Sequence, residues 1–243
     1  FDLLRDFDEV RSLLEANNTP AKPTFVAWPG RSEISEFEEW GAVQTTFSPY
    51  GFRADVTPSA LEAVRHRRAG VQDEGSQLVA SIFAQAAADK SSWLDLCAGP
   101  GGKAALLASI AGQGDHRFVA NEISQIRADL VKQVVGSHEV WVGDAREIAT
   151  RGEGFDAILA DVPCTGMGAL RRRPEVRWRR SLSDLRELGV LQREISDAAI
   201  SILNVGGVFG YATCSPHLAE TSIAVADILK KHPELEQIDI QPF

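Results

Sequence analysis

Cysteine is scarce in this chain. The 243 residues contain three cysteines, Cys97, Cys164 and Cys214, and none of them stands in CxxC spacing. So few and so widely separated thiols do not form a disulfide framework, and they argue against a structural zinc site or a redox pair. We therefore expect a protein of the reducing cytoplasm that binds no metal.

Long hydrophobic runs are also missing. Hydrophobic residues make up 44% of the chain, as in ordinary globular proteins, and no run approaches the roughly 20 residues of a membrane span. Residues 1–6 are charged and unlike a signal peptide. Because the chain begins with Phe rather than Met, we expect a fragment or a missing start. Its length suits one large domain or two unequal ones.

The net charge of −9 argues against nucleic-acid binding only if the charge is evenly spread, and it is not. Positive charge concentrates in one segment, opposed there only by Glu175. Six arginines lie within ten residues: Arg171, Arg172, Arg173, Arg177, Arg179 and Arg180. A basic site on an acidic body is compatible with a polyanionic ligand.

Apolar runs alternate with amphipathic stretches over residues 71–243, which predicts a doubly wound parallel α/β sheet. The expected strands are residues 92–97, 117–121, 139–142, 155–161, 208–212 and 235–240. The expected helices are residues 76–89, 103–111, 124–135, 183–203 and 216–231. Residues 1–70 read as a separate small α+β module, with an amphipathic helix over 2–16 and a strand over 24–28.

A glycine turn joins the first expected strand to its helix. Gly99-Pro100-Gly101-Gly102-Lys103-Ala104 satisfies the loose dinucleotide pattern, but it is not a P-loop, because Ala104 follows Lys103. Glycines let the backbone approach a ligand, and the N–H groups at a helix start hold an anion. That anion could be a pyrophosphate or the carboxylate of a methionine moiety.

Carboxylates end the next two expected strands. Glu122 comes about twenty residues after the turn, where it can accept both ribose hydroxyls of an adenosine. Asp144 follows the third strand and could accept from an adenine amino group. Each alone could be an ordinary surface carboxylate, but in order at successive strand ends the two favour a cofactor site.

Two cysteine segments follow the last two buried strands. Cys164 ends Asp161-Val162-Pro163-Cys164, and Cys214 lies in Thr213-Cys214-Ser215. Both thiols thus stand at strand carboxyl ends, where open α/β sheets build their sites. We expect Ser215 to cap the following helix, so that the helix dipole lowers the pKa of Cys214. Gly166 and Gly168 predict close approach of another group. We expect Cys97 to lie inside its strand.

These motifs resemble those of the RNA cytosine-C5 methyltransferases, a family that includes the bacterial small-subunit rRNA methyltransferase B, or Sun, and the nucleolar Nop-type proteins. The likeness rests on residues 95–103, 161–164 and 213–215, and on the arginine segment with Trp178. It covers residues 71 to about 231 well. Leu96 is inserted, and Gly99 and Glu122 replace the usual alanine and aspartate. We also expect the family's last, antiparallel strand and the helical RNA-binding domain of the Sun proteins to be absent.

The resemblance implies a fold, a cofactor and roles for individual residues. The fold would be a Rossmann-like class I methyltransferase sheet, the cofactor S-adenosylmethionine, and the substrate a cytosine of RNA, with rRNA favoured over tRNA. Cys214 would add to C6, Asp161 would bind the base, Cys164 would remove the C5 proton, and Lys103 would orient Asp161 or the base. The arginine segment would bind RNA phosphates. The implied cofactor residues are Cys97, Ala98, Gly99, Pro100, Gly101, Gly102, Lys103, Glu122, Asp144 and Asp161.

Three other interpretations remain open. An NAD-type oxidoreductase would use the same turn, but it leaves both thiols and the arginines without a task. A non-catalytic RNA-binding or ribosome-assembly factor would keep the fold, although intact Asp161, Cys164 and Cys214 speak against it. An adenine N6-methyltransferase is disfavoured because Pro163 is followed by Cys164 rather than by an aromatic residue. Within the favoured family, the two thiols could also exchange roles.

Overall fold

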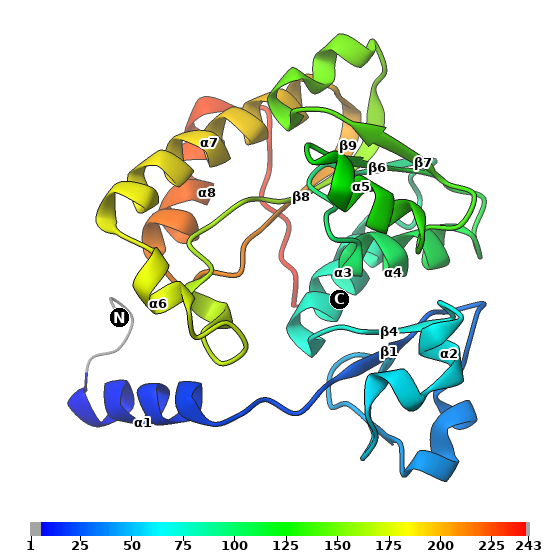
Figure 1. Ribbon diagram of the computed structural model, residues 1–243. Helices are drawn as coiled ribbons and strands as arrows, with labels where there is room; N and C mark the ends of the chain where they lie inside the picture. Colours follow the sequence, from blue (N-terminus) through cyan, green and yellow to red (C-terminus); the bar gives the residue numbers. More distant parts are fainter. Residues whose placement is uncertain (1–5, 242–243) are drawn as a thin grey trace. The chain divides into compact units, whose positions relative to one another are not determined.

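The computed structural model of the protein describes residues 6–241, which form two compact units (Figure 1). The sheet unit comprises Lys22–Ala160, Ala198–Gly210 and residues 240–241. The cysteine unit comprises residues 6–21, Asp161–Asp197 and Tyr211–Asp239. The domain boundary expected near residue 70 stays a prediction.

A five-stranded sheet has the order β7-β6-β5-β8-β9. Its strands are β5 (Ser92–Asp95), β6 (Arg117–Glu122), β7 (Glu139–Val142), β8 (Phe155–Asp161) and β9 (Leu203–Ala212). β5 pairs in parallel with β6 and β8, and β6 with β7. From β5 the chain builds outward to β7 and then returns to the other side of β5. This reversal of strand order is the doubly wound pattern, so the predicted fold class is confirmed.

The central strands form because their sequences are almost continuously apolar, as in parallel sheets covered on both faces. In register, Leu94 of β5 stands beside Val119 of β6 and Ile158 of β8, and all three are fully buried. This core fixes where the strands end. Asp95 and Glu122 close β5 and β6, so the turns that follow them begin at one edge of the sheet.

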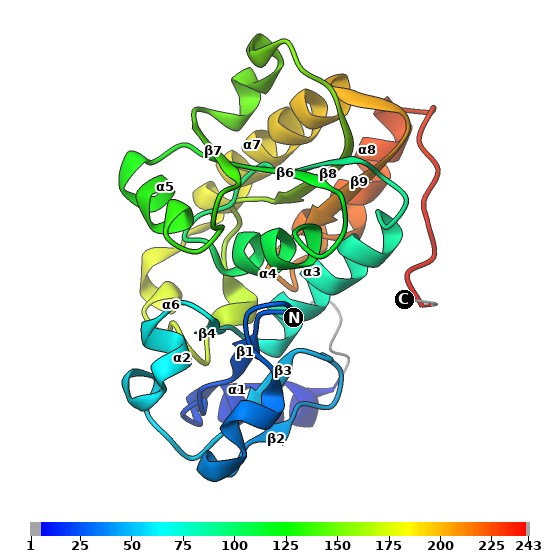
Figure 2. The same ribbon diagram turned by 90° about the vertical axis from the view of Figure 1, so that its right-hand side faces the viewer.

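The longer helices of the sheet unit are α3 (Glu74–Ala86), α4 (Gly102–Ala111) and α5 (Gln125–Lys132), and a 3-10 turn, η3 (Ala145–Arg151), follows β7. α4 is hydrophobic all round and almost wholly buried, which is the pattern of a helix enclosed in a core. α3 packs along α4, and the two run side by side in Figure 2. α5 packs on β6 and β7.

A small antiparallel sheet precedes the parallel one, and its strand β1 (Phe25–Ala27) lies within the strand expected over residues 24–28. Its order is β2 (Val43–Gln44), β3 (Gly51–Arg53), β1 (Phe25–Ala27) and β4 (Ala69–Val71), with the short helices η1 (Ile34–Trp40), η2 (Pro58–Ala60) and α2 (Glu62–Arg65). Phe52 stacks on both Phe25 and Phe37 in its core. Arg31 and Arg67 donate to the carbonyls of Val134 and Gln133, beyond the end of α5, where a helix favours cations.

The cysteine unit holds the remaining helices: α1 (Phe7–Asn18), η4 (Met167–Ala169), α6 (Val176–Arg179), η5 (Leu218–Glu220), α8 (Ser222–Lys231) and most of α7 (Leu182–Ser201). The expected helix over 2–16 is found as α1, and residues 2–5 lie outside the described part of the chain. α1 buries none of its side chains. Among residues 6–241, no helix combines the length and apolarity needed to cross a membrane.

Two expected elements differ. Residues 235–240 were expected to be a strand, but this segment has no regular structure, because it pairs with neither sheet. The expected helix over 216–231 begins later, with η5 at Leu218 and α8 at Ser222. Pro216 thus lies in the preceding loop, and the N-cap of η5 is His217, whose ring accepts from the Ala219 N–H.

Candidate active site

The glycine turn adopts the strand–turn–helix geometry that the sequence predicts. Ala98 N–H donates to the Asn121 carbonyl at 2.9 Å, and Gly101 N–H donates to Ala98 O at 2.8 Å. Gly101 has φ +114°, a conformation that residues with side chains rarely adopt. α4 begins at the next residue, so its first N–H groups face the turn and can bind an anion.

Glu122 fixes this turn from the end of β6. Its carboxylate is 3% exposed, and Oε2 accepts the Gly99 N–H at 3.0 Å. Oε1 accepts from Ser124 N–H at 2.9 Å and from Arg127 at 2.6 Å. A Cβ at Gly99 would collide with Oε2, which explains the glycine. Since a carboxylate offers about four acceptor positions, these three bonds leave about one for a ligand hydroxyl.

Asn121, which sequence reasoning missed, joins the two neighbouring strand ends. Its Nδ2 donates to Leu96 O at 3.0 Å and to Gly143 O at 3.2 Å. Within the described chain its Oδ1 is buried without a hydrogen-bond partner. A buried acceptor in this state is uncommon, and a donor from a ligand at this edge would satisfy it. The only signal for Asn121 in the sequence is that it directly precedes Glu122.

Asp144 lies at the N-cap of η3. It accepts from the Arg146 N–H at 2.9 Å and from the Arg146 guanidinium at 2.6 Å. The hydrogen bond from the Arg146 side chain lowers the pKa of Asp144 despite partial burial, so the carboxylate is ionised at neutral pH. Its role toward an adenine stays a prediction.

The other predicted cofactor residues are placed by their elements. Cys97 lies in the turn after Asp95, the last residue of β5, which corrects the expectation that it lies inside the strand. Ala98 and Pro100 belong to the same turn, and Gly102 and Lys103 are the first two residues of α4. Asp161 is the last residue of β8 and is half-buried.

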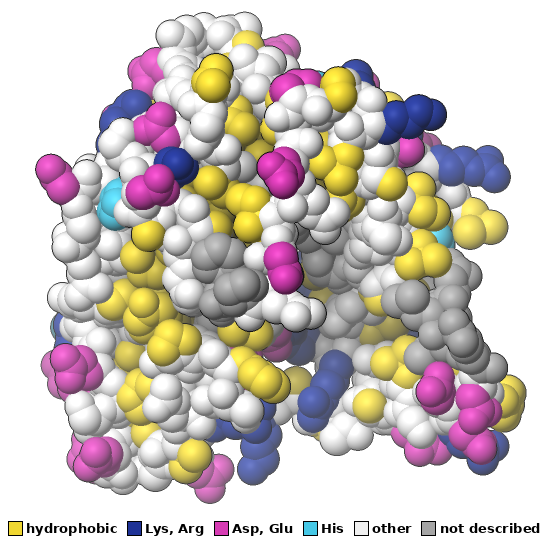
Figure 3. Space-filling view, turned by 180° about the vertical axis from the view of Figure 1, so that it is seen from behind, with side chains coloured by type: hydrophobic (Ala, Val, Ile, Leu, Met, Phe, Trp, Pro, Cys, Tyr) yellow, Lys and Arg dark blue, Asp and Glu magenta, His cyan; other side chains and the backbone are white. Residues whose placement is uncertain are grey.

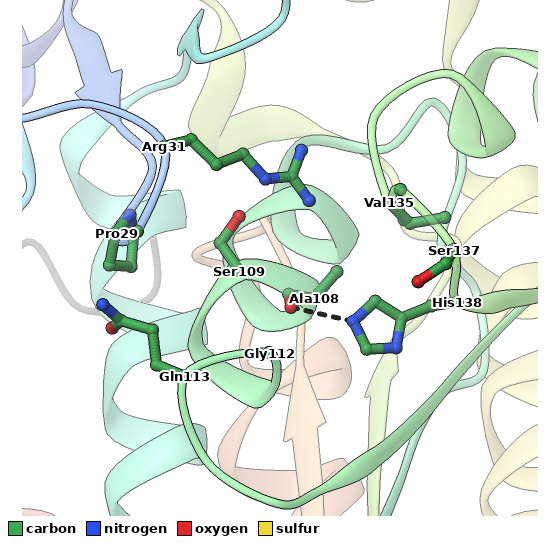
Figure 4. A pocket seen from close by; sticks show the side chains of 11 residues that line it. Pro29, Arg31, Ala108, Ser109, Gly112, Gln113, Val135, Ser137 and His138 are labelled. Carbon is green, nitrogen blue, oxygen red and sulfur yellow. Dashed lines mark hydrogen bonds between the residues drawn. The ribbon is translucent and has the colours of Figure 1, made fainter.

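A cavity of about 270 Å³ lies at the other end of α4 (Figure 4). Arg31, Ser109, Gln113 and His138 are among its lining residues, and His138 Nε2 is 3.1 Å from Ala108 O. The ten residues of α4 span about 15 Å, which separates this cavity from the glycine turn. The cavity is therefore distinct from the predicted cofactor turn.

The two predicted thiols come together in the cysteine unit. Cys164 Sγ and Cys214 Sγ are 3.3 Å apart, within hydrogen-bond distance for sulfur. Neither cysteine forms a disulfide; Cys164 is half-buried, whereas Cys214 is exposed. Two cysteines that are fifty residues apart in the sequence thus form a pair of thiols that can share a proton.

The pKa of Cys164 is lowered to about 6. The hydrogen bond with Cys214 is the largest cause; burial opposes it, and the Thr213 side chain and two backbone groups add to it. Cys164 is therefore mostly thiolate at neutral pH. The sequence predicts a lowered pKa for Cys214 instead, through a helix that begins at Ser215. That helix start is absent, so its dipole argument does not apply.

The two glycines expected near the thiols behave differently. Gly168 N–H donates to the Cys214 carbonyl at 2.8 Å, and a Cβ on Gly168 would come within 2.6 Å of that oxygen. The group that approaches closely is thus the backbone of the second cysteine loop. Gly166 has φ +74° and serves the turn itself.

A buried carboxylate that the sequence analysis did not single out supports both cysteine loops. Glu220 is 0% exposed, accepts the Thr165 N–H at 2.8 Å and the Thr165 hydroxyl at 2.5 Å, and accepts from Gln192 Nε2 at 3.0 Å. The Ser215 side chain also hydrogen-bonds it. Burial would raise the pKa of Glu220, but these hydrogen bonds outweigh it and leave the pKa below its usual value.

The six predicted RNA-binding arginines divide by their contacts. Arg171 donates to the carbonyls of Thr19 and Pro20, and Arg177 donates to Asn18, so both hold the end of α1. Arg180 reaches the Cys164 carbonyl at 3.5 Å. Trp178 is 78% exposed beside them. The other three are exposed on the same segment: Arg172, Arg173 and Arg179.

Charges of both signs are interspersed over the face drawn in Figure 3, with apolar side chains between them. The net charge of −9 is thus not a uniform negative field on this face. This distribution is consistent with the predicted local basic segment on an acidic chain.

The strand order and the glycine turn define the fold of the class I methyltransferases. Solved structures agree with this assignment. The crystal structure titled PH0851 superposes with a TM-score of 0.83 at 25% identity, over 93% of this chain and 54% of that chain. NSun6 from Pyrococcus horikoshii, solved with SFG, gives a TM-score of 0.78 at 17% identity, over 92% of this chain and 84% of that chain.

The chain belongs to the family described as 16S rRNA methyltransferase RsmB/F, whose model matches residues 82–243. The resemblance inferred from the motifs is therefore confirmed. Rv1407 of Mycobacterium tuberculosis, whose name gives a methyltransferase without a substrate, is 52% identical over 97% of this chain and 52% of that protein. Ribosomal RNA small subunit methyltransferase B of Vibrio cholerae is 35% identical over 97% of this chain and 56% of that protein. The chain thus spans about half the length of these relatives.

Proposed function

We propose that this chain transfers a methyl group from S-adenosylmethionine to C5 of a cytosine in RNA, most favourably 16S rRNA, in the cytoplasm. The observation that carries the proposal is the 3.3 Å approach of Cys164 and Cys214 on two loops that follow sheet strands. Membership of the RsmB/F family supports the ribosomal substrate. Paired thiols also give the covalent route a nucleophile and a base, which a binding protein would not need.

Cytosine C5 is a weak nucleophile, so the ring has to be activated. The thiol proton of the exposed Cys214 first passes to Cys164 and from there to solvent. Cys214 then adds as thiolate to C6, and the new S–C6 bond moves the electron pair of the C5–C6 double bond toward C5. Asp161 accepts a hydrogen bond from the exocyclic amine and shares a proton with N3, which stabilises the negative charge that develops on the ring. The bound methyl donor would supply its methyl group to C5 and would leave as a neutral thioether with the electron pair of the broken bond.

Cys164 completes the reaction as a general base. Its thiolate accepts the proton from C5, the electrons of the C5–H bond restore the double bond, and the Cys214 sulfur leaves C6. In the free protein the lowered pKa of Cys164, about 6, makes it the thiolate that can accept the Cys214 proton before the addition to C6. A half-buried Cys164 and an exposed Cys214 favour this division of roles over the reverse.

The residues of the glycine turn fit the methyl donor, which when bound supplies an electrophilic methyl group. The N–H groups at the start of α4 would hold its carboxylate, Glu122 a ribose hydroxyl, and Asp144 the adenine amine. The open acceptor on Asn121 and the glycines that keep the turn close to Glu122 support this fit. A neighbour of the same fold was solved with SFG, an analogue of the donor.

Exposed arginines and Trp178 would contact the RNA. Arg172, Arg173 and Arg179 would neutralise phosphates, and Trp178 offers a face on which an unstacked base can lie. Arg171 and Arg177 would instead hold α1 in place, given their contacts with residues 18–20.

The proposal is tested by methyl transfer in vivo and in vitro. Bisulfite sequencing of RNA from cells with and without the gene should show one 16S rRNA cytosine whose protection depends on the protein. The purified full-length protein should transfer label from S-adenosylmethionine to 16S rRNA from the deletion strain. RNA binding without transfer would instead support the assembly-factor alternative, and calorimetric binding of NAD without S-adenosylmethionine would support the oxidoreductase.

A further inference from the structure

The strongest feature that the proposed reaction leaves unused is the buried network around Glu220. A fully buried carboxylate is costly unless donors saturate it. The donors here are the Thr165 backbone and hydroxyl, the Gln192 amide and the Ser215 hydroxyl. All are neutral groups, so the charge of Glu220 is balanced by directed hydrogen bonds rather than by a cation among them.

Two of these donors adjoin a cysteine in the sequence. Thr165 directly follows Cys164, and Ser215 directly follows Cys214. Their hydroxyl oxygens are 3.1 Å apart. Gln192, on α7, also donates to the Pro163 carbonyl at 2.9 Å, on the other side of Cys164. One carboxylate and its partner amide therefore bind both loops at the residues that flank the sulfurs.

The network is also braced from β9 and from within α7. Tyr211, at the end of β9, donates its hydroxyl to the Glu220 carbonyl at 3.0 Å and lies 3.3 Å from Gln192 Oε1. Ser196, on α7, donates to the Gln192 carbonyl at 2.8 Å and is fully buried. Because Tyr211 and Gln192 come from β9 and α7, the position of Glu220 is set by the fold as well as by the loops it binds.

We propose that Glu220 is a positioning residue, which anchors Thr165 and Ser215 to one carboxylate and so keeps the sulfurs of Cys164 and Cys214 within hydrogen-bond distance. It acts through these residues and touches neither thiol itself. An effect of Glu220 on methyl transfer rests on the proposed function, since it requires both thiols to act on one cytosine. An effect of Glu220 on the pKa of Cys164 does not rest on it, because the sulfur–sulfur hydrogen bond is present in the protein without substrate.

The two oxygens of Glu220 have different partners. Oε1 accepts the N–H groups of Thr165 and Gln192, whereas Oε2 accepts from the Thr165 hydroxyl. A glutamine could replace this pattern, because a hydroxyl can also accept from an NH2 group. A leucine has nearly the same size but accepts no hydrogen bond, so Glu220→Leu should let the two loops separate. Since the sulfur–sulfur hydrogen bond is the largest cause of the lowered pKa of Cys164, separating the loops should raise that pKa.

The test is the pH profile of thiol labelling in Glu220→Leu, without RNA or methyl donor. Iodoacetamide labelling of each cysteine is measured by peptide mass spectrometry, next to wild type and the exposed control Glu236→Leu. In wild type and control, Cys164 labelling should have a midpoint near pH 6. In Glu220→Leu the midpoint should move toward the ordinary thiol pKa of about 8.5, and a full shift lowers the thiolate fraction at pH 7 about 30-fold.

A folded Glu220→Leu protein whose Cys164 midpoint stays near 6 overturns the proposal. Cooperative thermal unfolding establishes that the variant is folded. If it is not, Thr165→Val and Ser215→Ala each remove one donor, and Thr165→Ser restores the hydroxyl. The first two should raise the midpoint and the third should return it; unchanged midpoints in both overturn the proposal as well. A failure of methyl transfer with the expected labelling shift would count against the proposed function alone.

Discussion

The glycine turn of the sheet unit and the thiol pair of the cysteine unit are each held by a buried glutamate, and the two glutamates are stabilised differently. Glu122 has an arginine partner, Arg127, and binds one turn through Gly99. Glu220 receives only neutral donors among the bonds described above, and it binds two loops fifty residues apart. Both glutamates therefore fix the geometry of a loop through directed hydrogen bonds, but Glu122 is also paired with a cation, whereas the described donors to Glu220 are all neutral.

The largest effect in this comparison is expected at Gly168. In Gly168→Ala the new Cβ would meet the backbone carbonyl of Cys214, which cannot move aside without shifting the thiol. A displacement near 1 Å at reacting atoms costs about 100-fold, so methyl transfer to 16S rRNA should fall by about that factor. Gly189→Ala, on α7, meets only an arginine side chain at ordinary contact distance and should keep its activity. Equal activity of the two variants would contradict the account.

A smaller effect, confined to the cofactor, is expected at the turn. In Gly99→Ala the Cβ would displace the Glu122 carboxylate and with it the ribose acceptor. The Kd for S-adenosylmethionine in calorimetry should rise about tenfold, the equivalent of one lost hydrogen bond of about 1.4 kcal/mol. Labelling of Cys164 should stay as in wild type. An unchanged Kd would show that Glu122 does not contribute to binding the cofactor.

The pH dependence of Cys164 labelling reports on the thiol pair alone and not on the glycine turn. Because its pKa is lowered to about 6, the thiolate should be the main form above that pH and should be lost as the pH falls through it. Iodoacetamide labelling should be nearly constant above about pH 7 and fall about tenfold per unit below about pH 5. A midpoint between 8 and 9 would show an ordinary thiol and would argue against Cys164 as the base.

The smallest effects are expected in the arginine segment, where two classes of residue differ. Arg173→Ala and Arg179→Ala should each weaken RNA binding a few-fold and reduce the salt slope by about one unit. Arg171→Ala should instead loosen α1, because it removes two hydrogen bonds to residues 19 and 20, and it should increase proteolysis there. Filter binding over a salt series and limited proteolysis distinguish the two classes. If all three variants behaved alike in both assays, the division between RNA-binding arginines and an arginine that holds α1 would be contradicted.

Most of the fold could be predicted because periodic apolar runs dominate it. The bounds of β7 and β8 match the expected strands, and the turn geometry follows from the glycines. The last expected strand failed because residues 235–240 carry a strand-like apolar pattern that finds no partner in either sheet. Periodicity reports a local tendency, while a strand needs a neighbour.

The predicted thiols came together as expected, but their supports could not be found from motifs. Glu220 and Gln192 are ordinary polar residues in sequence, on helical segments, and their burial depends on tertiary packing. The dipole argument for Cys214 failed because a Ser-Pro pair indicates a helix start without guaranteeing it. His217, two residues later, forms the cap instead.

The central claim is that Cys214 forms the covalent bond to cytosine and that Cys164 releases it. It is tested most directly by incubating wild type, Cys214→Ala and Cys164→Ala with S-adenosylmethionine and 16S rRNA, followed by a denaturing gel. The account predicts a stable protein–RNA adduct in Cys164→Ala, and neither adduct nor turnover in Cys214→Ala. An adduct in Cys214→Ala but not in Cys164→Ala would reverse the roles, and methyl transfer that survives both substitutions would contradict the covalent mechanism.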